Sequence, residues 1–187
     1  MPERRPRADA VRNRERVLSA AREAFAEAGP AVSLDDVARR AGVGPGTVHR
    51  HFPTKDALFA AVIADRLQDL AARAAQLSES TDPGAAFFDF FHVLATEAAQ
   101  NLALSAALTD TSHLTDPIHA AGRDLESSIA TLLQRAQAAG AVRPDLTTTE
   151  LHAVIAGALV MEQRLPPESR GRGLRLVADG LAHRPGQ

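Results

Sequence analysis

Residues 33–55, SLDDVARRAGVGPGTVHRHFPTK, carry the signals of two short helices separated by a tight turn. Ser33 precedes Asp36 by three positions, which is the capping-box spacing found at helix starts. Gly42 supplies the positive φ that a tight helix exit needs. Pro45 suits the first position of the next helix, because its missing amide proton would have no partner there. The stretch therefore predicts helix, turn and helix in quick succession.

Two short helices joined by a glycine-containing turn form the helix-turn-helix unit, whose second helix enters the DNA major groove. The second helix suits this role because Pro45, Gly46 and Thr47 at its start are small and allow a close approach to DNA. Val48 and Phe52 lie four positions apart and are expected to face inward together. The remaining side chains of this helix offer hydrogen-bond donors to DNA: His49, Arg50 and His51.

Basic residues flank this unit on both sides. Lys55 is predicted near the N-terminus of the following helix, where a cation is disfavoured unless an anion such as phosphate lies close. Arg12, Arg14 and Arg16 stand at the start of the preceding amphipathic helix. We interpret them as an arm that touches phosphate and assign Arg14 to the DNA-binding set. A solvated, charged helix end is the alternative.

The chain resembles the TetR family of bacterial transcription regulators over RNRERVLSAAREAFAEAG (12–29) and SLDDVARRAGVGPGTVHRHFPTKDALFAAV (33–62). The resemblance implies a homodimer that binds a pseudo-palindromic operator in double-stranded DNA and is released by a small ligand held in its C-terminal domain. It also implies phosphate contacts at Ser33, His49 and Lys55. His49 departs from the usual tyrosine, and a Gly replaces the usual Ser or Thr cap at position 44. An imidazole would make the phosphate contact pH-dependent.

Composition agrees with a globular DNA-binding protein. The 187 residues are 45% hydrophobic and include no cysteine, which excludes disulfides and thiolate metal sites. The formal net charge is −2, but residues 1–60 carry eleven basic and eight acidic side chains, so the predicted DNA-binding half is the basic half. No apolar run approaches the length of a membrane span. We therefore expect a cytoplasmic protein without a membrane partner.

Helical periodicity continues to the C-terminus, and no segment alternates with a period of two. This pattern predicts an all-α fold with a three-helix DNA-binding head followed by a helical bundle. The expected domains are a flexible arm (1–9), a helix-turn-helix domain (10–54) and a ligand-binding and dimerisation domain (55–187). About nine helices are predicted, over 12–28, 34–41, 45–52, 55–77, 83–100, 101–111, 116–139, 148–165 and 168–183.

Aromatic residues in the predicted bundle indicate a ligand pocket. Four of the seven phenylalanines lie within 87–91 and span most of a helix circumference, so one neighbouring helix cannot cover them all. By the family resemblance, this helix faces a ligand cavity with an apolar lining and a polar rim. The alternative is ordinary core packing on two sides. The predicted ligand-binding residues are Phe87, Phe88, Phe91, His92, Leu108 and His113.

Two further helices carry signs of self-association. Small residues on the helix over 148–165 would allow another helix to approach closely, and an apolar stripe runs along the last helix. Paired across a two-fold axis, they would form a four-helix interface. Packing of the two helices within one chain is the alternative. The predicted interface residues are Ala153, Gly157, Val160, Leu174, Val177 and Leu181.

Catalytic and metal-binding patterns have little support. Asp110, His113, Asp116 and His119 recur every three residues, but Pro117 and a predicted break prevent one helix from presenting them together. No Ser/His/Asp arrangement or phosphate-binding glycine loop is present, so we expect no enzyme activity, cofactor or metal. The sequence predicts a ligand-responsive repressor. The alternative is a helical small-molecule-binding or scaffold protein whose DNA-binding head is not controlled by ligand.

Overall fold

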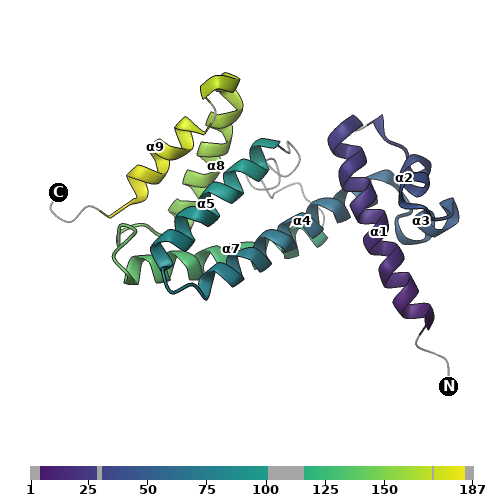
Figure 1. Ribbon diagram of the computed structural model, residues 1–187, viewed down its shortest axis with the longest axis horizontal. Coiled ribbons are helices and arrows are strands. Elements are labelled where there is room, and N and C mark those ends of the chain that lie inside the picture. Colours follow the sequence, from purple (N-terminus) through teal and green to yellow (C-terminus); the bar gives the residue numbers. More distant parts are fainter. Residues whose placement is uncertain (1–4, 29–30, 101–115, 170, 184–187) are drawn as a thin grey trace. The chain divides into compact units, whose positions relative to one another are not determined.

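The computed structural model describes residues 5–28, 31–100, 116–169 and 171–183. Throughout these ranges the regular structure is helical, which confirms the all-α prediction (Figure 1). The predicted helix over 101–111 lies outside the described residues. The helices are α1 (Arg5–Ala28), α2 (Leu34–Ala41), α3 (Pro45–His51), α4 (Lys55–Ser78), α5 (Pro83–Gln100), α7 (Asp116–Ala138), α8 (Thr148–Arg164) and α9 (Arg172–Leu181), with a short 3-10 helix, η2, at Pro167–Ser169.

Contacts divide the chain into two compact units, Met1–Asp65 and Arg66–Gln187, and α4 contributes to both. We call them the head and the body. The division between head and body falls within α4. The boundary predicted between residues 54 and 55 separates a DNA-binding domain from a ligand-binding domain, and it stays a prediction. No helix in the described part of the chain is long and apolar enough to cross a membrane.

The head packs α1, α2, α3 and the start of α4 around a core of small side chains. Val48 and Phe52 are both buried, as their spacing predicted. Alanine and valine predominate in this core, so the helices approach one another closely. Its buried members are Val17, Leu18, Ala20, Ala21, Ala24, Val32, Val37, Ala38, Ala41, Val48, Phe52, Leu58 and Val62.

Both ends of α2 are formed as the sequence predicted. The Ser33 Oγ accepts from the Asp36 amide at 3.1 Å, and the Asp36 carboxylate accepts from the Ser33 amide at 3.2 Å. Gly42 ends the helix in the left-handed region with φ 63°. Side chains other than glycine adopt that conformation at a cost, so the turn into α3 depends on this residue.

The first helix extends further towards the N-terminus than expected. Residues 5–9, predicted to belong to a flexible arm, form the beginning of α1. Pro6 does not prevent this, because proline is tolerated in the first turn of a helix.

The body consists of the second half of α4 with α5, α7, α8 and α9. Leucine, isoleucine and phenylalanine fill its core. Two polar contacts hold α4 in place. Arg66 pairs with Glu97 of α5, with Nε 3.1 Å from Oε2. Arg135 of α7 donates to the carbonyls of Ser78, the last residue of α4, and of Ser80, which follows the helix. Arginine suits both places because its planar guanidinium carries five donors.

A buried carboxylate joins α8 to α9. Glu162, only 2% exposed, accepts from the amides of Gly171 at 2.6 Å and Leu174 at 3.2 Å, the first turn of α9. A Cβ at Gly173 would lie 2.5 Å from the Cε of Met161, so α9 approaches α8 closely there. These contacts explain why α9 begins at Arg172, after a 3-10 turn, and not at 168 as predicted.

Candidate nucleic-acid interface

The recognition helix α3 presents one polar side and one buried side. Val48 is fully buried in the head core, whereas Pro45, Gly46 and the three residues His49, Arg50 and His51 are exposed. Thr47 is half-buried at the edge of this surface. No acidic residue lies on α3, so the exposed side carries only neutral and basic groups. A surface of this kind suits contact with the negatively charged DNA backbone and with base edges.

Several of the exposed side chains have partners within the head. Arg50 donates from Nε to the carbonyl of Gly46 at 2.9 Å, so its guanidinium lies back along α3. The Nε2 of His49 is 3.8 Å from the Oδ1 of Asp35, and both side chains are exposed. Asp35 therefore competes with a phosphate group for a protonated His49.

Ser33 uses its hydroxyl within the head. Its Oγ donates to the Asp36 carboxylate at 2.6 Å as well as accepting from the Asp36 amide. The Ser33 hydroxyl, followed by the Arg39 guanidinium at 2.5 Å, lowers the pKa of Asp36 to about 2. A phosphate group would have to displace the carboxylate to reach the hydroxyl proton.

Lys55 lies at the start of α4 and is half-buried. Thr54 precedes it and accepts from the amide of Ala57 at 3.1 Å, so Thr54 caps α4. The cap fixes the backbone on which Lys55 is carried, directly after α3.

The three arginines of α1 that were predicted to touch phosphate have three different partners. Arg12 pairs with Asp9 on its own helix. The guanidinium of Arg14 lies 5.8 Å from the centre of the Phe52 ring. Arg16 reaches across to α2, where its Nη2 donates to the carbonyls of Ala41 at 2.6 Å and Gly42 at 3.3 Å. The arginines therefore do not form one uniform arm, and Arg14 is placed beside the C-terminal end of α3.

The predicted ligand-binding residues on α5 differ in how far they are exposed to solvent. Phe87 and Phe91 are buried, whereas Phe88 is half-buried and His92 is exposed. Leu108 and His113 lie outside the described residues. The buried pair belongs to an apolar seam between α5, α7 and α8 whose free space is about 10 Å³, enough for no more than about one water molecule. This seam is lined by Phe87, Phe90, Phe91, Leu94, Ile129, Leu132, Leu151 and Ile155.

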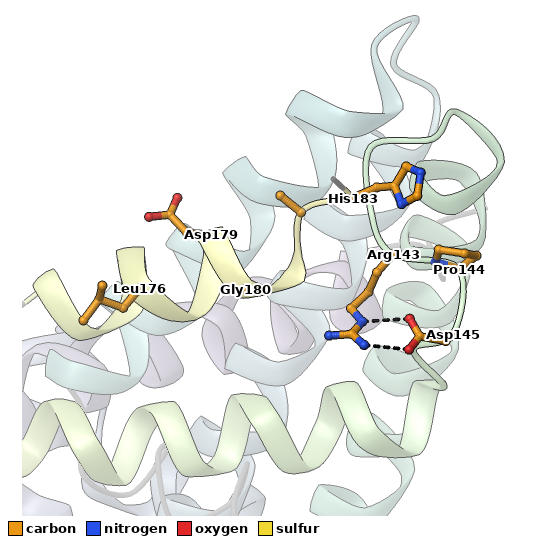
Figure 2. A pocket seen from close by; sticks show the side chains of 8 residues that line it. Arg143, Pro144, Asp145, Leu176, Asp179, Gly180 and His183 are labelled. Atoms are coloured by element: carbon orange, nitrogen blue, oxygen red, sulfur yellow. Dashed lines mark hydrogen bonds and ion pairs between the residues drawn. The ribbon is translucent and has the colours of Figure 1, made fainter. Parts of the chain in front are cut away.

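A more open cleft lies where the α7–α8 connection meets the end of α9. Figure 2 shows Arg143 and Asp145 on one side and Leu176 and Asp179 on the other, and the cleft has a volume of about 630 Å³. Arg143 donates to both carboxylate oxygens of Asp145, at 2.7 and 2.6 Å, and holds the pKa of Asp145 to about 2. No local pattern could have indicated this cleft, because its two sides are more than thirty positions apart.

The predicted dimer residues also divide by helix. On α8, Ala153, Gly157 and Val160 are exposed. On α9, Leu174 and Leu181 are buried within their own body and Val177 is half-buried. The exposed apolar residue of α9 is Leu176, at 65% exposure, which the apolar stripe did not single out. Leu174 and Leu181 therefore pack within their own chain, and a part of α9 in dimerisation stays a prediction.

Both units of the chain match known protein families. Residues 17–62 match the family described as bacterial regulatory proteins of the tetR family, and residues 82–183 match the C-terminal domain of SbtR-like transcriptional regulators. The chain belongs to the TetR family of bacterial transcription regulators.

Solved structures and a curated relative agree with this assignment. A TetR regulator from Mycobacterium vanbaalenii is 38% identical, with a TM-score of 0.72 over 94% of this chain and 98% of that one. The regulator SCO0520 from Streptomyces coelicolor is 30% identical, with a TM-score of 0.70 over 91% and 98%. The regulator TtgW from Pseudomonas putida is 41% identical over 68 residues, which are 36% of this chain. The match spans 51% of TtgW, about half of its length.

Proposed function

We propose that this TetR-family regulator is a repressor that binds a pseudo-palindromic operator as a homodimer and is released by a small apolar or amphipathic effector. The observation that carries the proposal is the recognition helix. Its inner side is anchored by Val48 and Phe52, and its outer side exposes Gly46, Arg50 and His51 without any acidic residue on the helix. Such a helix is fixed by packing on its inner side and exposes its polar side, which can enter the major groove.

Dimerisation is proposed through the exposed face of α8. Ala153, Gly157 and Val160 follow one another at helical spacing and are all exposed. Small side chains on this face allow the same helix of a second protomer to approach closely across a two-fold axis. A dimer doubles the number of base contacts, which one seven-residue helix could not supply alone.

The seam between α5, α7 and α8 is the proposed effector site. Its lining is wholly apolar, but its free space is about 10 Å³. An effector that enters must therefore separate these helices, which would stabilise a second arrangement of the body. Arg66 binds Glu97 of α5, so α4 is linked to a helix that forms one wall of the seam.

DNA binding is tested by fluorescence anisotropy with duplexes selected from genomic fragments by the wild-type protein. We expect the Thr47→Ala/His51→Ala double variant to weaken binding by at least about thirtyfold, because two contacts are worth about 1–3 kcal/mol each. The matched control is Thr131→Ala/His183→Ala, which changes two exposed residues of the body. Equal affinity of the two double variants would refute the assignment of α3.

Effector control is tested by melting the protein with a library of small aromatic and aliphatic compounds. Compounds that raise the melting temperature are then added to the DNA complex. Release of DNA would support the proposal. Compounds that stabilise the protein but leave DNA bound would favour a DNA-binding protein without ligand control.

A further inference from the structure

Arg16 links α1 to the turn between the two helices of the DNA-binding unit. Its Nη2 donates to the carbonyls of Ala41 at 2.6 Å and Gly42 at 3.3 Å, twenty-five and twenty-six positions along the chain. Ala41 is the last residue of α2 and Gly42 is its C-cap. The guanidinium therefore lies on the C-terminal end of α2, where carbonyl groups lack helical partners and the helix dipole favours a cation.

Two backbone amides at this end of α2 bond back to the helix. The amides of Gly42 and Val43 bond back to α2, with Val43 donating to the carbonyl of Ala38 at 3.0 Å. These bonds use carbonyls inside the last turn and leave those of Ala41 and Gly42 for Arg16. A Cβ at Gly42 would lie 2.9 Å from the same Nη2, so the arginine fits closely against the turn.

The turn that Arg16 contacts determines where α3 begins. Only Val43 separates the C-cap of α2 from Gly44, the N-cap of α3, which provides no side-chain hydrogen bond. α3 has seven residues, too few to keep its direction by its own hydrogen bonds. A small displacement of the turn would therefore be carried directly to the residues that face DNA.

We propose that Arg16 is a positioning residue for DNA recognition, which fixes the turn between α2 and α3 through the carbonyls of Ala41 and Gly42. The inference rests on the proposed DNA binding and assigns Arg16 a role different from a phosphate contact. Arg12 belongs to the same group of arginines predicted to touch phosphate, but it pairs with Asp9 on its own helix. The positioning role is therefore proposed for Arg16 and not for Arg12.

The test compares Arg16→Met, Arg16→Gln and the control Arg123→Met, which changes an exposed arginine of α7, in binding to a duplex selected by the wild-type protein. Affinity is measured by anisotropy over a range of salt concentrations, at a temperature where circular dichroism shows each variant to be folded. Charge-assisted hydrogen bonds support a loss of about ten- to a hundredfold for Arg16→Met. Arg16→Gln keeps a donor and should lose less, and Arg123→Met should bind within about threefold of wild type.

The salt dependence separates positioning from phosphate contact. A positioning role predicts that the slope of log Kd against log salt stays at the wild-type value in both Arg16 variants. A slope reduced by about one per protomer would instead identify a phosphate ligand and overturn the proposal. Wild-type affinity in Arg16→Met would also overturn it, and Arg16→Gln decides the slope if the methionine variant does not fold. Failure of the wild-type protein to bind any duplex would refute the proposed function, which is a separate result.

Discussion

Replacement of Glu162 by alanine should destabilise the body by a predictable amount. The carboxylate is 2% exposed and accepts from the amides of Gly171 and Leu174. Loss of the acceptor leaves the buried Leu174 amide without a partner, at about 1–3 kcal/mol, and the Gly171 amide is open enough for water to replace part of its bond. With the small cavity left by the side chain, the total cost is about 2–4 kcal/mol.

The free energy of unfolding is measured by urea titration followed by far-ultraviolet circular dichroism, together with the melting temperature. A loss of this size corresponds to a decrease of roughly 5–15 °C for a protein of this length. Glu162→Gln keeps one acceptor oxygen and should cost about half as much. The control is Glu168→Ala, an exposed residue of the same connection, which should stay within about 0.5 kcal/mol of wild type. If Glu162→Ala is no more destabilising than this control, the carboxylate does not hold α9 in place.

Three further changes have expected outcomes. Gly42→Ala should lower the melting temperature through a cost of about 1–2 kcal/mol, because alanine is strained at φ 63°. In a comparison of urea midpoints, Gly173→Ala should destabilise by about 1–3 kcal/mol, since its Cβ would overlap α8, whereas Gly180→Ala on the same helix meets no atom within 4 Å and should be neutral or stabilising. The pKa of Asp36 is lowered to about 2, chiefly by the Ser33 hydroxyl, so its contribution to stability is present above about pH 4 and is lost as the pH falls towards 2. Melting of wild type and Asp36→Asn across this range should converge at the acidic end, and a constant difference would contradict the assignment.

Local signals in the sequence were sufficient for the helix starts that carry a capping box. The predicted capping box of Ser33 with Asp36 is complete, and Thr147 with Glu150 forms another at the start of α8, because in each case all the groups lie within four consecutive residues. Gly42 adopts the predicted positive φ for the same reason. Backbone conformation that depends on neighbours in the chain can be inferred from those neighbours.

Contacts between distant segments could not be inferred in this way. Three arginines on α1 share one sequence pattern, yet their partners are an aspartate, a phenylalanine ring and two carbonyls. Nothing in the sequence distinguishes Glu162 from the other glutamates on helices, because its partner at the start of α9 lies nine positions away and is reached only in the folded chain. Three phenylalanines of α5 line an apolar seam, but the space among them depends on the distance between three helices, which periodicity does not contain.

The way α3 is anchored has a consequence for the thermodynamics of recognition. Pro45 restricts its own φ, the Thr47 amide bonds to the carbonyl of Gly44 at 2.8 Å, and the side chains of Val48 and Phe52 are 0% and 4% exposed. Ordering a free segment of backbone would cost about 1–2 kcal/mol per residue. Because this helix is already ordered before it meets DNA, that entropy is lost during folding and not during binding. The heat capacity change of complex formation should accordingly reflect the surfaces that meet, with little contribution from folding of the recognition helix.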